Sequence, residues 1–426
     1  MSRLLVVVVS ALTLFSSVSL LAVSPMGGNS SLDPGNLEND RKESSTWVNN
    51  GVIGKGVFSS GSGSNCAILD NPLGGSKVYC WGSINDADDY NQDGTNYEDR
   101  SRDGPIEVGL GYQASAVSVG NFHACGIKSG QVHCWGVNQQ GQLGIGCWDE
   151  NPSVDTWYSV EPEETNVCIG DGGWNVTAVT SGSQHSCSIN WENSGGFNPP
   201  QNPPFNGISV FCWGSNSYNQ VAGGDPPPFF EGNSSSPTSV NYWSTPQMVS
   251  LPEGKTPLMI DAGAYHTCVL MDDNSVYCWG KNAAGQLGGF PESSGAPVMV
   301  SGLPSDEQVA SIEVGTYATC AVMEYGDIYC WGGGPLGVSG VSESDSPLKV
   351  DFPIGSGDAK QVVVGYGASC SLMDDGDVYC WGYTEQIGLG SQVCQQYHSY
   401  CASGYLTQPI ASLQFPTSSP VELITS

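Results

Sequence analysis

Positive charge is scarce in this sequence. Only 12 of its 426 residues are Lys or Arg, against 42 Asp or Glu, and no arginine follows Arg102. The formal net charge is therefore -30. Proteins that bind DNA or RNA neutralise phosphates with clustered cations, and anionic membrane surfaces attract the same side chains. We therefore predict no nucleic-acid partner and no membrane partner beyond an N-terminal anchor. The acidity itself is typical of a soluble surface.

Catalytic motifs and helical periodicity are also missing. The chain has no nucleophile elbow, no phosphate-binding loop and no H-E-x-x-H pair, and it holds only five histidines. Its 16 cysteines form no C-x-x-C redox motif. No segment repeats apolar residues at helical spacing. These absences favour a non-enzymatic, all-β protein, while the many acidic side chains leave an Asp/Glu pair for hydrolysis open.

The N-terminus carries the longest apolar run. Arg3 precedes an uncharged stretch from Leu4 to Val23, so residues 1–24 predict a signal peptide or a retained signal anchor. An even number of cysteines, 16, fits an oxidising compartment, and we expect a secreted or cell-surface protein. Residues 25–50 are polar with few apolar anchors and predict a flexible tether, which leaves 51–426 for the folded part.

A repeat organises the rest of the chain. A Cys-Trp-Gly triplet recurs six times, with its tryptophan at positions 81, 135, 213, 279, 331 and 381. Each copy follows an apolar segment that ends in glycine, such as SAVSVG or QVVVG, and a second segment that carries another cysteine. Valine-rich runs bounded by Gly and Pro predict β-strands, and a period near 50 residues predicts a propeller or a solenoid.

Proline-containing strands lie between the copies and suggest how the array ends. Segments of the form Pro-x-x-apolar at 105–108, 246–249, 297–300 and 347–350 stand upstream of later copies, whereas the first copy has none. A spare segment of this form, PVEL, occurs at 420–423. We therefore expect the C-terminal strand to pair with the first blade and close a ring, which leaves few free sheet edges.

The motifs resemble the regulator of chromosome condensation repeat family. The G-x-x-H-x-C/A-L strand, the V-Y-C-W-G strand and the N-x-x-G-Q-L-G tail carry the resemblance, which covers roughly residues 52–424. It implies a β-propeller of four-stranded blades. Six copies predict six blades, and seven, the number in the family's well-known propellers, is the alternative. The resemblance also gives the repeat histidines a packing and hydrogen-bonding role within the blade, and we expect the tryptophans of the Cys-Trp-Gly strands to pack between or beneath blades.

The repeat cysteines pose a choice between disulfides and zinc. His123, His185 and His266 each stand two residues before a repeat cysteine, but Ser64, Ala318 and Ala368 replace them elsewhere, so a repeated zinc site is disfavoured. If the cysteines of one copy face each other across a hairpin, the loops 272–274, 324–326 and 374–376 each hold three residues and end in Gly or Asn, which tolerate a left-handed conformation. We predict the disulfides Cys66–Cys80, Cys125–Cys134, Cys187–Cys212, Cys268–Cys278, Cys320–Cys330 and Cys370–Cys380, with Cys147–Cys168 and Cys394–Cys401 as staples of longer loops.

One acidic insert suggests calcium. Asp89, Asn91, Asp93 and Gly94 form D-x-N-x-D-G, the first half of a calcium loop, and Thr95 adds a backbone carbonyl. Arg100 stands where an EF-hand needs a glutamate, so Glu98 or Asp99 would have to substitute. An ordinary acidic, turn-rich loop is the alternative, and calcium is the one cofactor the sequence suggests.

The function expected from these features is binding rather than catalysis. We expect an exported monomeric propeller that binds an unknown protein or glycan through insert loops at 83–104, 145–175, 191–207, 217–243 and 391–417. Nucleotide exchange on a nuclear GTPase, which the family name suggests, does not fit an exported acidic chain. The alternative is a secreted hydrolase that uses carboxylates in the propeller channel.

Overall fold

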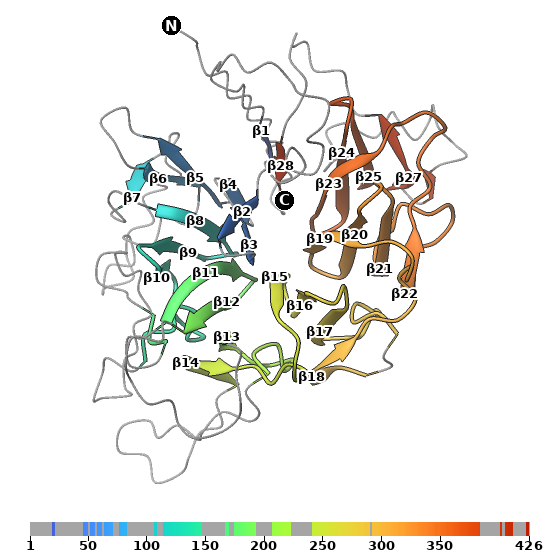
Figure 1. Ribbon diagram of the computed structural model, residues 1–426. Helices are drawn as coiled ribbons and strands as arrows, with labels where there is room; N and C mark the ends of the chain where they lie inside the picture. Colours follow the sequence, from blue (N-terminus) through green and yellow to red (C-terminus); the bar gives the residue numbers. More distant parts are fainter. Residues whose placement is uncertain are drawn as a thin grey trace, which may run out of the picture. The chain divides into compact units, whose positions relative to one another are not determined.

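The computed structural model shows short antiparallel strands as the regular elements of the chain (Figure 1). No helix occurs in the part that it describes, and none there could therefore cross a membrane. The described residues are 19–21, 46–49, 52–55, 58–61, 64–70, 76–82, 106–108, 114–146, 167–169, 174–192, 207–222, 241–289, 292–383, 401–402, 405–411 and 423–425.

Six sheets repeat one pattern, and we number them blades 1 to 6 in chain order. Blade 1 holds β4 (Phe58–Gly61), β5 (Ser64–Asp70), β6 (Ser76–Gly82) and β7 (Ile106–Val108). Blade 2 holds β8 (Ala114–Val119), β9 (His123–Lys128) and β10 (Gln131–Gly136) within the described residues. Blade 3 holds β11 (Trp174–Ser181), β12 (His185–Glu192), β13 (Ile208–Ser215) and β14 (Tyr242–Met248).

The later blades follow the same order. Blade 4 holds β15 (Pro257–Ala262), β16 (His266–Met271), β17 (Val276–Gly280) and β18 (Ser294–Met299). Blade 5 holds β19 (Val309–Val314), β20 (Ala318–Met323), β21 (Ile328–Gly333) and β22 (Glu343–Lys349). Blade 6 holds β23 (Ala359–Val364), β24 (Ala368–Met373), β25 (Val378–Tyr383), β27 (Tyr405–Ala411) and the short β26 (Cys401–Ala402).

The chain divides into two compact units. Residues 49–283 and 290–300 form the unit that contains blades 1 to 4, and residues 1–48, 284–289 and 301–426 form the unit that contains blades 5 and 6. Two small ladders complete the described strands: β2 (Thr46–Asn49) with β3 (Val52–Lys55), and β1 (Ser19–Leu21) with β28 (Leu423–Thr425).

The middle hairpin of each blade has the register that the cysteine spacing predicts. Cys268 lies directly opposite Cys278, and the repeat cysteines of the other five blades face each other in the same way. The three-residue loop 272–274 is closed by a hydrogen bond from the Met271 amide to the Ser275 carbonyl, 2.9 Å long. Asn274 has φ 70°, and Gly326 and Gly376 have φ 88° and 89°, so the expected left-handed residue is present in all three loops.

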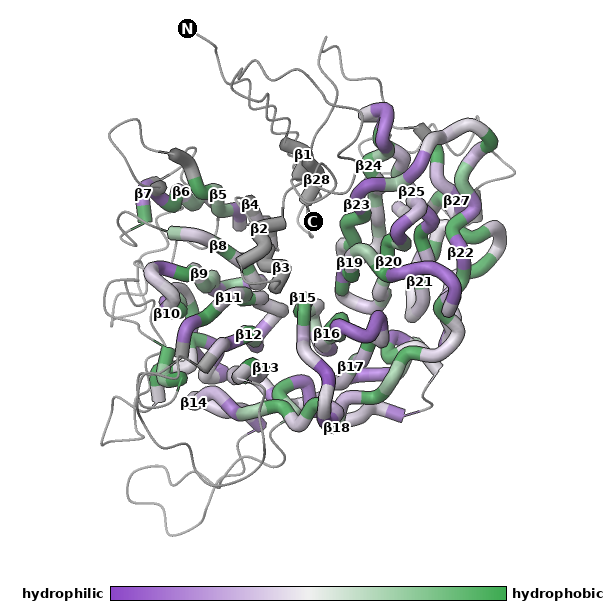
Figure 2. The backbone as a smooth tube through the Cα atoms, viewed as in Figure 1, coloured by the Kyte–Doolittle hydropathy of each residue, from purple (hydrophilic) through white to green (hydrophobic). Residues whose placement is uncertain are grey.

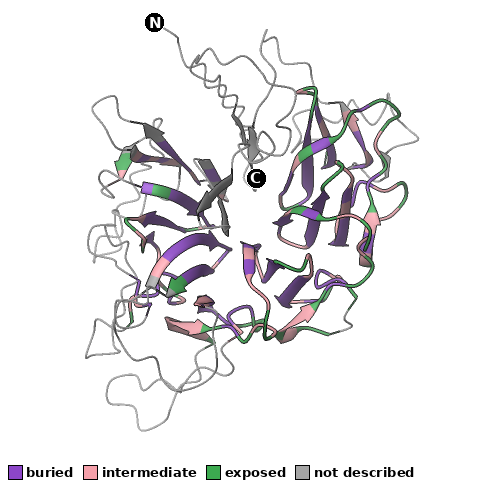
Figure 3. Cartoon of the chain, in the orientation of Figure 1, coloured by how far each residue is buried: buried purple, intermediate pink, exposed green. Residues whose placement is uncertain are grey.

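Burial falls from the middle of each blade to its outer strand. β16, β20 and β24 are buried along their whole length, whereas β14, β18 and β22 are mostly half-buried or exposed (Figure 3). Hydrophobic and hydrophilic segments therefore follow one another along the chain within each blade (Figure 2). This pattern is that of a sheet whose inner strands pack against neighbouring sheets while its outer edge faces water.

The proline-containing strands belong to the preceding hairpin, which differs from the assignment by sequence. β7 pairs with β6 in blade 1, and β18 and β22 pair with the Cys-Trp-Gly strands β17 and β21. The first blade thus has its own fourth strand. The described pairing of β28 is with β1 rather than with blade 1, so closure of the ring by the C-terminal strand stays a prediction.

The glycine of each Cys-Trp-Gly triplet is required by a close backbone approach. Gly280 has φ 109°, and a Cβ there would lie 2.6 Å from the carbonyl oxygen of Tyr265. Gly332 and Gly382 repeat this geometry, with φ 99° and 117° and a carbonyl oxygen 2.3 Å from the Cβ position. The contact fixes the turn between the first two strands of a blade against the end of the third strand.

Replacing Gly280 should therefore lower the free energy of unfolding more than replacing a glycine that is required only for its positive φ. Gly254 has φ 76°, but nothing lies within 4 Å of its Cβ position. We expect Gly254→Ala to lower the free energy of unfolding by roughly 1 kcal/mol, from the left-handed conformation alone. Gly280→Ala should cost roughly 2–4 kcal/mol, because overpacking adds to that strain. Urea unfolding measures both, and equal losses would contradict the close approach.

Candidate functional site

The repeat cysteines are structural. Disulfides join Cys66–Cys80, Cys125–Cys134, Cys187–Cys212, Cys268–Cys278, Cys320–Cys330 and Cys370–Cys380, with Cα atoms 4.0–4.1 Å apart. All twelve of these side chains are at most 2% exposed. Cys168 is also disulfide-bonded. Its expected partner Cys147, and the side chains of the expected pair Cys394–Cys401, lie outside the described residues.

Two of the repeat histidines contact the next blade. The Nε2 of His185 shares a hydrogen bond of 2.9 Å with the hydroxyl of Thr267, and the Nε2 of His123 lies 2.8 Å from the hydroxyl of Ser186. All three repeat histidines are fully buried. Among the described residues no group of three His, Cys, Asp or Glu side chains could hold a metal ion. The His-x-Cys pattern is therefore part of the junction between blades.

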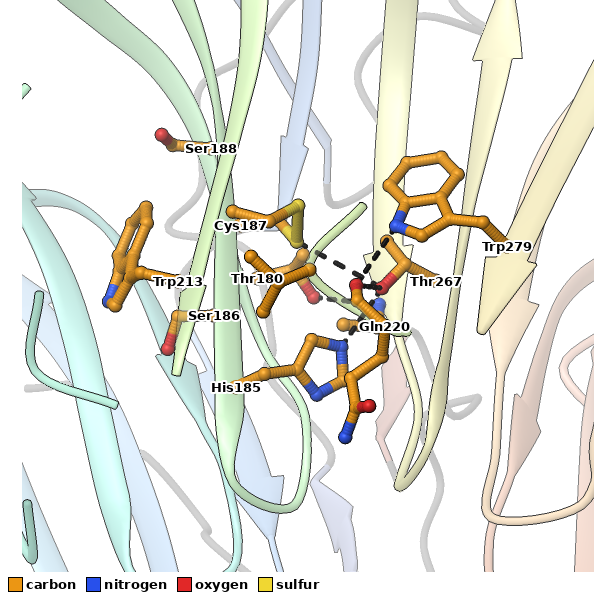
Figure 4. The surroundings of a disulfide bond; sticks show 12 residues. Thr180, His185, Ser186, Cys187, Ser188, Trp213, Gln220, Thr267 and Trp279 are labelled. Carbon is orange, nitrogen blue, oxygen red and sulfur yellow. Dashed lines mark hydrogen bonds between the residues drawn. A yellow bond between two sulfur atoms is a disulfide. The ribbon is translucent and has the colours of Figure 1, made fainter. Parts of the chain in front are cut away.

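A tail carbonyl and a tryptophan complete this junction. In Figure 4 the indole of Trp279 points to the carbonyl of Gln220, and its Nε1 donates a hydrogen bond of 2.9 Å. The hydroxyl of Thr267 reaches the same carbonyl at 3.5 Å. The carbonyl of Gln142 accepts in the same way from Trp213 and Ser186, at 2.8 and 3.3 Å.

The same contacts recur in the other unit. The carbonyl of Gln286 accepts hydrogen bonds from Trp331 at 3.0 Å and from Thr319 at 3.1 Å. In blade 6, Trp381 donates to the carbonyl of Pro335 at 3.1 Å. The tail of one repeat, which is the segment with the N-x-x-G-Q-L-G motif, thus supplies a carbonyl acceptor for the buried indole N–H of the next repeat. This contact gives the motif a structural role.

Blades 2 to 6 each present a short turn at the end where the first strand meets the second. The third residue of this turn offers its carbonyl to the amide that follows the Cys-Trp-Gly triplet. The pairs are Phe122 with Val137, Gln184 with Ser215, Tyr265 with Lys281, Tyr317 with Gly333, and Gly367 with Tyr383, at 2.8–2.9 Å. We call this the turn end of the blade. Its backbone is fixed, so the turn side chains are presented on a rigid support.

Aromatic side chains gather at the turn ends. In the unit of blades 1 to 4, Phe122 is 50% exposed, and the rings of Tyr218 and Tyr265 meet edge to face with centroids 5.1 Å apart. In the unit of blades 5 and 6, Tyr366 and Tyr383 are 47% and 44% exposed. The ring of Tyr317 lies 6.0 Å from that of Tyr366. Exposed aromatic residues on rigid turns are typical of binding surfaces.

In blades 4 to 6 the opposite end carries charge. There the loops between the second and third strands contain Asp272 and Asp273 in blade 4, Glu324 in blade 5, and Asp374 and Asp375 in blade 6. We call this the hairpin end. The hairpin loops of blades 4 to 6 thus hold carboxylates, although Tyr325 of blade 5 is also exposed there.

Most of the insert loops leave from the turn end. Ser215 pairs with Tyr242 and Tyr383 pairs with Tyr405, so the chain departs and returns there around residues 216–241 and 384–404, which overlap the expected inserts 217–243 and 391–417. Residues 405–411 of the second expected insert form the blade strand β27 instead. The inserts 83–104 and 145–175 also follow a Cys-Trp-Gly strand, whereas 191–207 follows β12 at the hairpin end. The inserts lie largely outside the described residues, as do Asp89, Asn91, Asp93 and Thr95 of the expected calcium loop.

Comparison with known proteins identifies the repeat. Two family profiles match, both described as the regulator of chromosome condensation (RCC1) repeat: one covers residues 129–189 and 209–270, the other 260–286 and 359–385. The chain carries RCC1 repeats. The matched segments fall on blades 2, 3, 4 and 6 and follow the order of strands found in the structure.

Similar proteins share these repeats over part of their length. The ultraviolet-B receptor UVR8 of Arabidopsis thaliana is 25% identical over 241 residues, which cover 56% of this chain and 46% of that protein. The probable E3 ubiquitin-protein ligase HERC6 of Homo sapiens is 32% identical over 228 residues, 52% of this chain and 18% of that protein. The chain thus spans less than half the length of these two relatives.

Solved structures agree on the fold. Human WBSCR16 superposes with a TM-score of 0.51 at 21% identity, covering 66% of this chain and 64% of that chain. Prp20p of Saccharomyces cerevisiae gives 0.50 at 18% identity, covering 74% and 68%. The RCC1-repeat chain is therefore a β-propeller, and its six blade sheets fit six blades.

The aromatic turn ends were not found by sequence reasoning, which looked for function in the inserts. A signal was present, because Phe122, Tyr265 and Tyr317 each stand directly before the repeat position that holds histidine or alanine. That position is outside the strand pattern, and only the structure shows that it faces solvent or a neighbouring ring.

The buried histidines of the RCC1 repeats make stability depend on pH. Burial lowers the pKa of His123, His185 and His266 from 6.5 to about 3, and the charges of the other two histidines add to the effect at His185. The unfolded chain binds these protons below about pH 6.5 and the folded chain does not, so this stabilisation is complete above pH 6.5 and is lost as the pH falls toward 3.

Replacing one histidine should therefore reduce the pH dependence of folding. Between pH 6 and pH 5, His185→Asn should lower the slope of the unfolding free energy by about 1.3 kcal/mol per pH unit. Thr267→Val removes the hydroxyl partner of His185 but keeps the titrating group, so it should preserve the slope while lowering stability. Denaturant unfolding at several pH values measures both, and an unchanged slope in His185→Asn would refute a neutral buried His185.

Proposed function

We propose that this RCC1-repeat propeller is a non-enzymatic protein-binding module that contacts its partner with the turn ends of its blades. The observation that carries the proposal is the exposure of aromatic rings there. Tyr366 is 47% exposed on its turn, and Tyr383 is 44% exposed at the end of β25, where its amide donates to the turn carbonyl of Gly367. In the other unit, Phe122 is 50% exposed on a turn that is held in the same way. Aromatic side chains supply large contact areas with few rotatable bonds, which favours their use as interface anchors.

The relatives support binding rather than a shared reaction. UVR8 is described as a receptor, HERC6 as a probable ubiquitin ligase, and the study of Prp20p concerns binding to Gsp1p and histones. One propeller thus occurs with several unrelated activities, as expected when function depends on surface residues rather than on the fold. A protein partner is proposed here, and a glycan is the alternative ligand for exposed aromatic rings.

We also propose that the chain is exported and monomeric. Six buried disulfides support an oxidising compartment, and the apolar run of residues 1–24 supports a signal peptide or anchor. A net charge of -30 disfavours self-association, because copies of the chain repel one another.

The hydrolase alternative would require carboxylates on the first strands of the blades. Asp261 is buried there, and its Oδ1 accepts hydrogen bonds from the Thr180 hydroxyl at 3.1 Å and the Ala262 amide at 2.9 Å. These contacts tie a carboxylate into the junction between blades 3 and 4. They give Asp261 a structural role that needs no substrate.

Capture of a partner from the native medium tests the proposed surface. We expect the double variant Tyr366→Ser/Tyr383→Ser, within the unit of blades 5 and 6, to retain roughly one tenth of the partner captured by the wild-type chain, because the loss of aromatic anchors typically costs more than 1 kcal/mol each. Tyr325→Ser is the matched control, since Tyr325 is 65% exposed at the hairpin end. Equal capture by the wild-type chain and the double variant would contradict binding at the turn ends.

Calcium at Asp89, Asn91, Asp93 and Thr95 remains a proposal, supported by the spacing of oxygen ligands in an insert that follows a Cys-Trp-Gly strand. The same capture with a chelator tests it. If calcium orders this insert, its removal should lower both partner capture and the unfolding temperature. If chelation changes neither, the calcium proposal is wrong.

A further inference from the structure

Blade 4 already holds a cation over two tyrosine rings. The Nζ of Lys281 lies 4.6 Å from the ring centroid of Tyr218 and 4.7 Å from that of Tyr265. Tyr265 is the third residue of the turn, and Lys281 directly follows the Cys-Trp-Gly triplet, so the amide of Lys281 also donates to the Tyr265 carbonyl at 2.9 Å. Both distances are within the range of a cation–π interaction. The turn end thus binds an ammonium group in the folded chain.

Blade 5 repeats the rings but not the lysine. Tyr317 holds the turn position that corresponds to Tyr265, and Tyr366 of the next blade supplies a second ring 6.0 Å away. The position that corresponds to Lys281 is Gly333. A Cβ at Gly333 would lie 2.7 Å from the Cβ of Ala284, so a lysine does not fit there without a shift.

Carboxylates are also present at the turn end of blade 5. Glu343 pairs with Gly333 in the ladder between β21 and β22, which places it at the turn end of blade 5, and it is exposed. Asp345 is two residues further along the same strand and is also exposed. A surface that combines aromatic faces with carboxylates attracts cations by both their charge and the ring quadrupole.

The described lysines of this unit lie at the other end. Lys349 forms an ion pair with Asp327, and Lys360 donates to the carbonyl of Asp374 at 3.2 Å. Asp327 and Asp374 belong to the hairpin ends of blades 5 and 6. The two described lysines of this unit are therefore directed to the hairpin end, while the rings and Glu343 are at the turn end.

We propose that Tyr317, Tyr366, Tyr383 and Glu343 form a site for an arginine side chain in an exposed segment of a partner protein. This inference rests on the proposed function and names the chemistry of the partner. An arginine fits because its planar guanidinium stacks on an aromatic ring and donates several hydrogen bonds to a carboxylate at once. The net charge of -30 favours approach of a basic segment and opposes an acidic one.

Fluorescence anisotropy with short labelled peptides tests the site on the full chain. One peptide carries arginine, and its partner carries citrulline, which keeps the shape and loses the charge. We expect the arginine peptide to bind and the citrulline peptide to bind at least tenfold more weakly. Tyr366→Leu should weaken binding of the arginine peptide about two- to fivefold, while Tyr366→Phe, which keeps the ring, should preserve it. Glu343→Gln should weaken binding and reduce its dependence on salt.

The control separates this site from general attraction to an acidic protein. Tyr325 is an exposed tyrosine among acidic residues at the hairpin end of the same unit, so Tyr325→Leu should leave binding of the arginine peptide unchanged. Equal weakening by Tyr325→Leu and Tyr366→Leu, or no weakening by Tyr366→Leu, overturns the proposal.

The outcome also separates this inference from the proposed function. If a protein captured from the native medium depends on Tyr366 but arginine and citrulline peptides bind alike, the arginine site is wrong and the binding surface stands. If neither the captured protein nor the arginine peptide depends on a turn-end residue, both are wrong. A glycan that binds through Tyr366 without competition from the arginine peptide likewise overturns the arginine site.

Discussion

The hydrogen bond from a buried tryptophan to the tail carbonyl of the preceding repeat is the constraint on which the rest of this structure depends. Trp213, Trp279, Trp331 and Trp381 are fully buried, and each places its Nε1–H on a backbone carbonyl of the repeat before it. A buried donor and a buried carbonyl would each be costly alone. Their pairing fixes the tail of one repeat against the hairpin of the next, and the hydroxyl of Ser186, Thr267 or Thr319 adds a second contact to the same carbonyl.

Because these contacts fix the interior of the blades, the side chains on the turns can differ from blade to blade. The backbone of each turn is held by the amide after the Cys-Trp-Gly triplet, and the glycine of that triplet allows the close approach. The third turn residue is then Phe122, Gln184, Tyr265 or Tyr317 without any change in the backbone contact. A conserved interior geometry with variable side chains on one end is what a binding module needs, because affinity and specificity then depend on surface residues alone.

The hairpins could be predicted from the sequence, because their signals are local. The cysteine spacing and a Gly or Asn at positions 274, 326 and 376 determine both register and turn type, and the structure contains both. The fourth strands were assigned to the wrong neighbour, because a Pro-x-x-apolar segment lies between two hairpins and only the ladder to β6, β17 or β21 shows its partner. The turn-end surface could not be predicted, since exposure of Tyr366 or Phe122 depends on how separate strands end together in space.

A comparison of two tryptophans tests the junction most directly. Trp279 donates to the Gln220 carbonyl at 2.9 Å, whereas the Nε1 of Trp135, which is also buried, has no hydrogen-bond partner among the described residues. Replacing either by phenylalanine removes a similar volume, but among the described residues only Trp279→Phe leaves a buried carbonyl without its indole donor. The account predicts that Trp279→Phe lowers the free energy of unfolding by about 1–3 kcal/mol more than Trp135→Phe does. Equal losses in urea unfolding would contradict it.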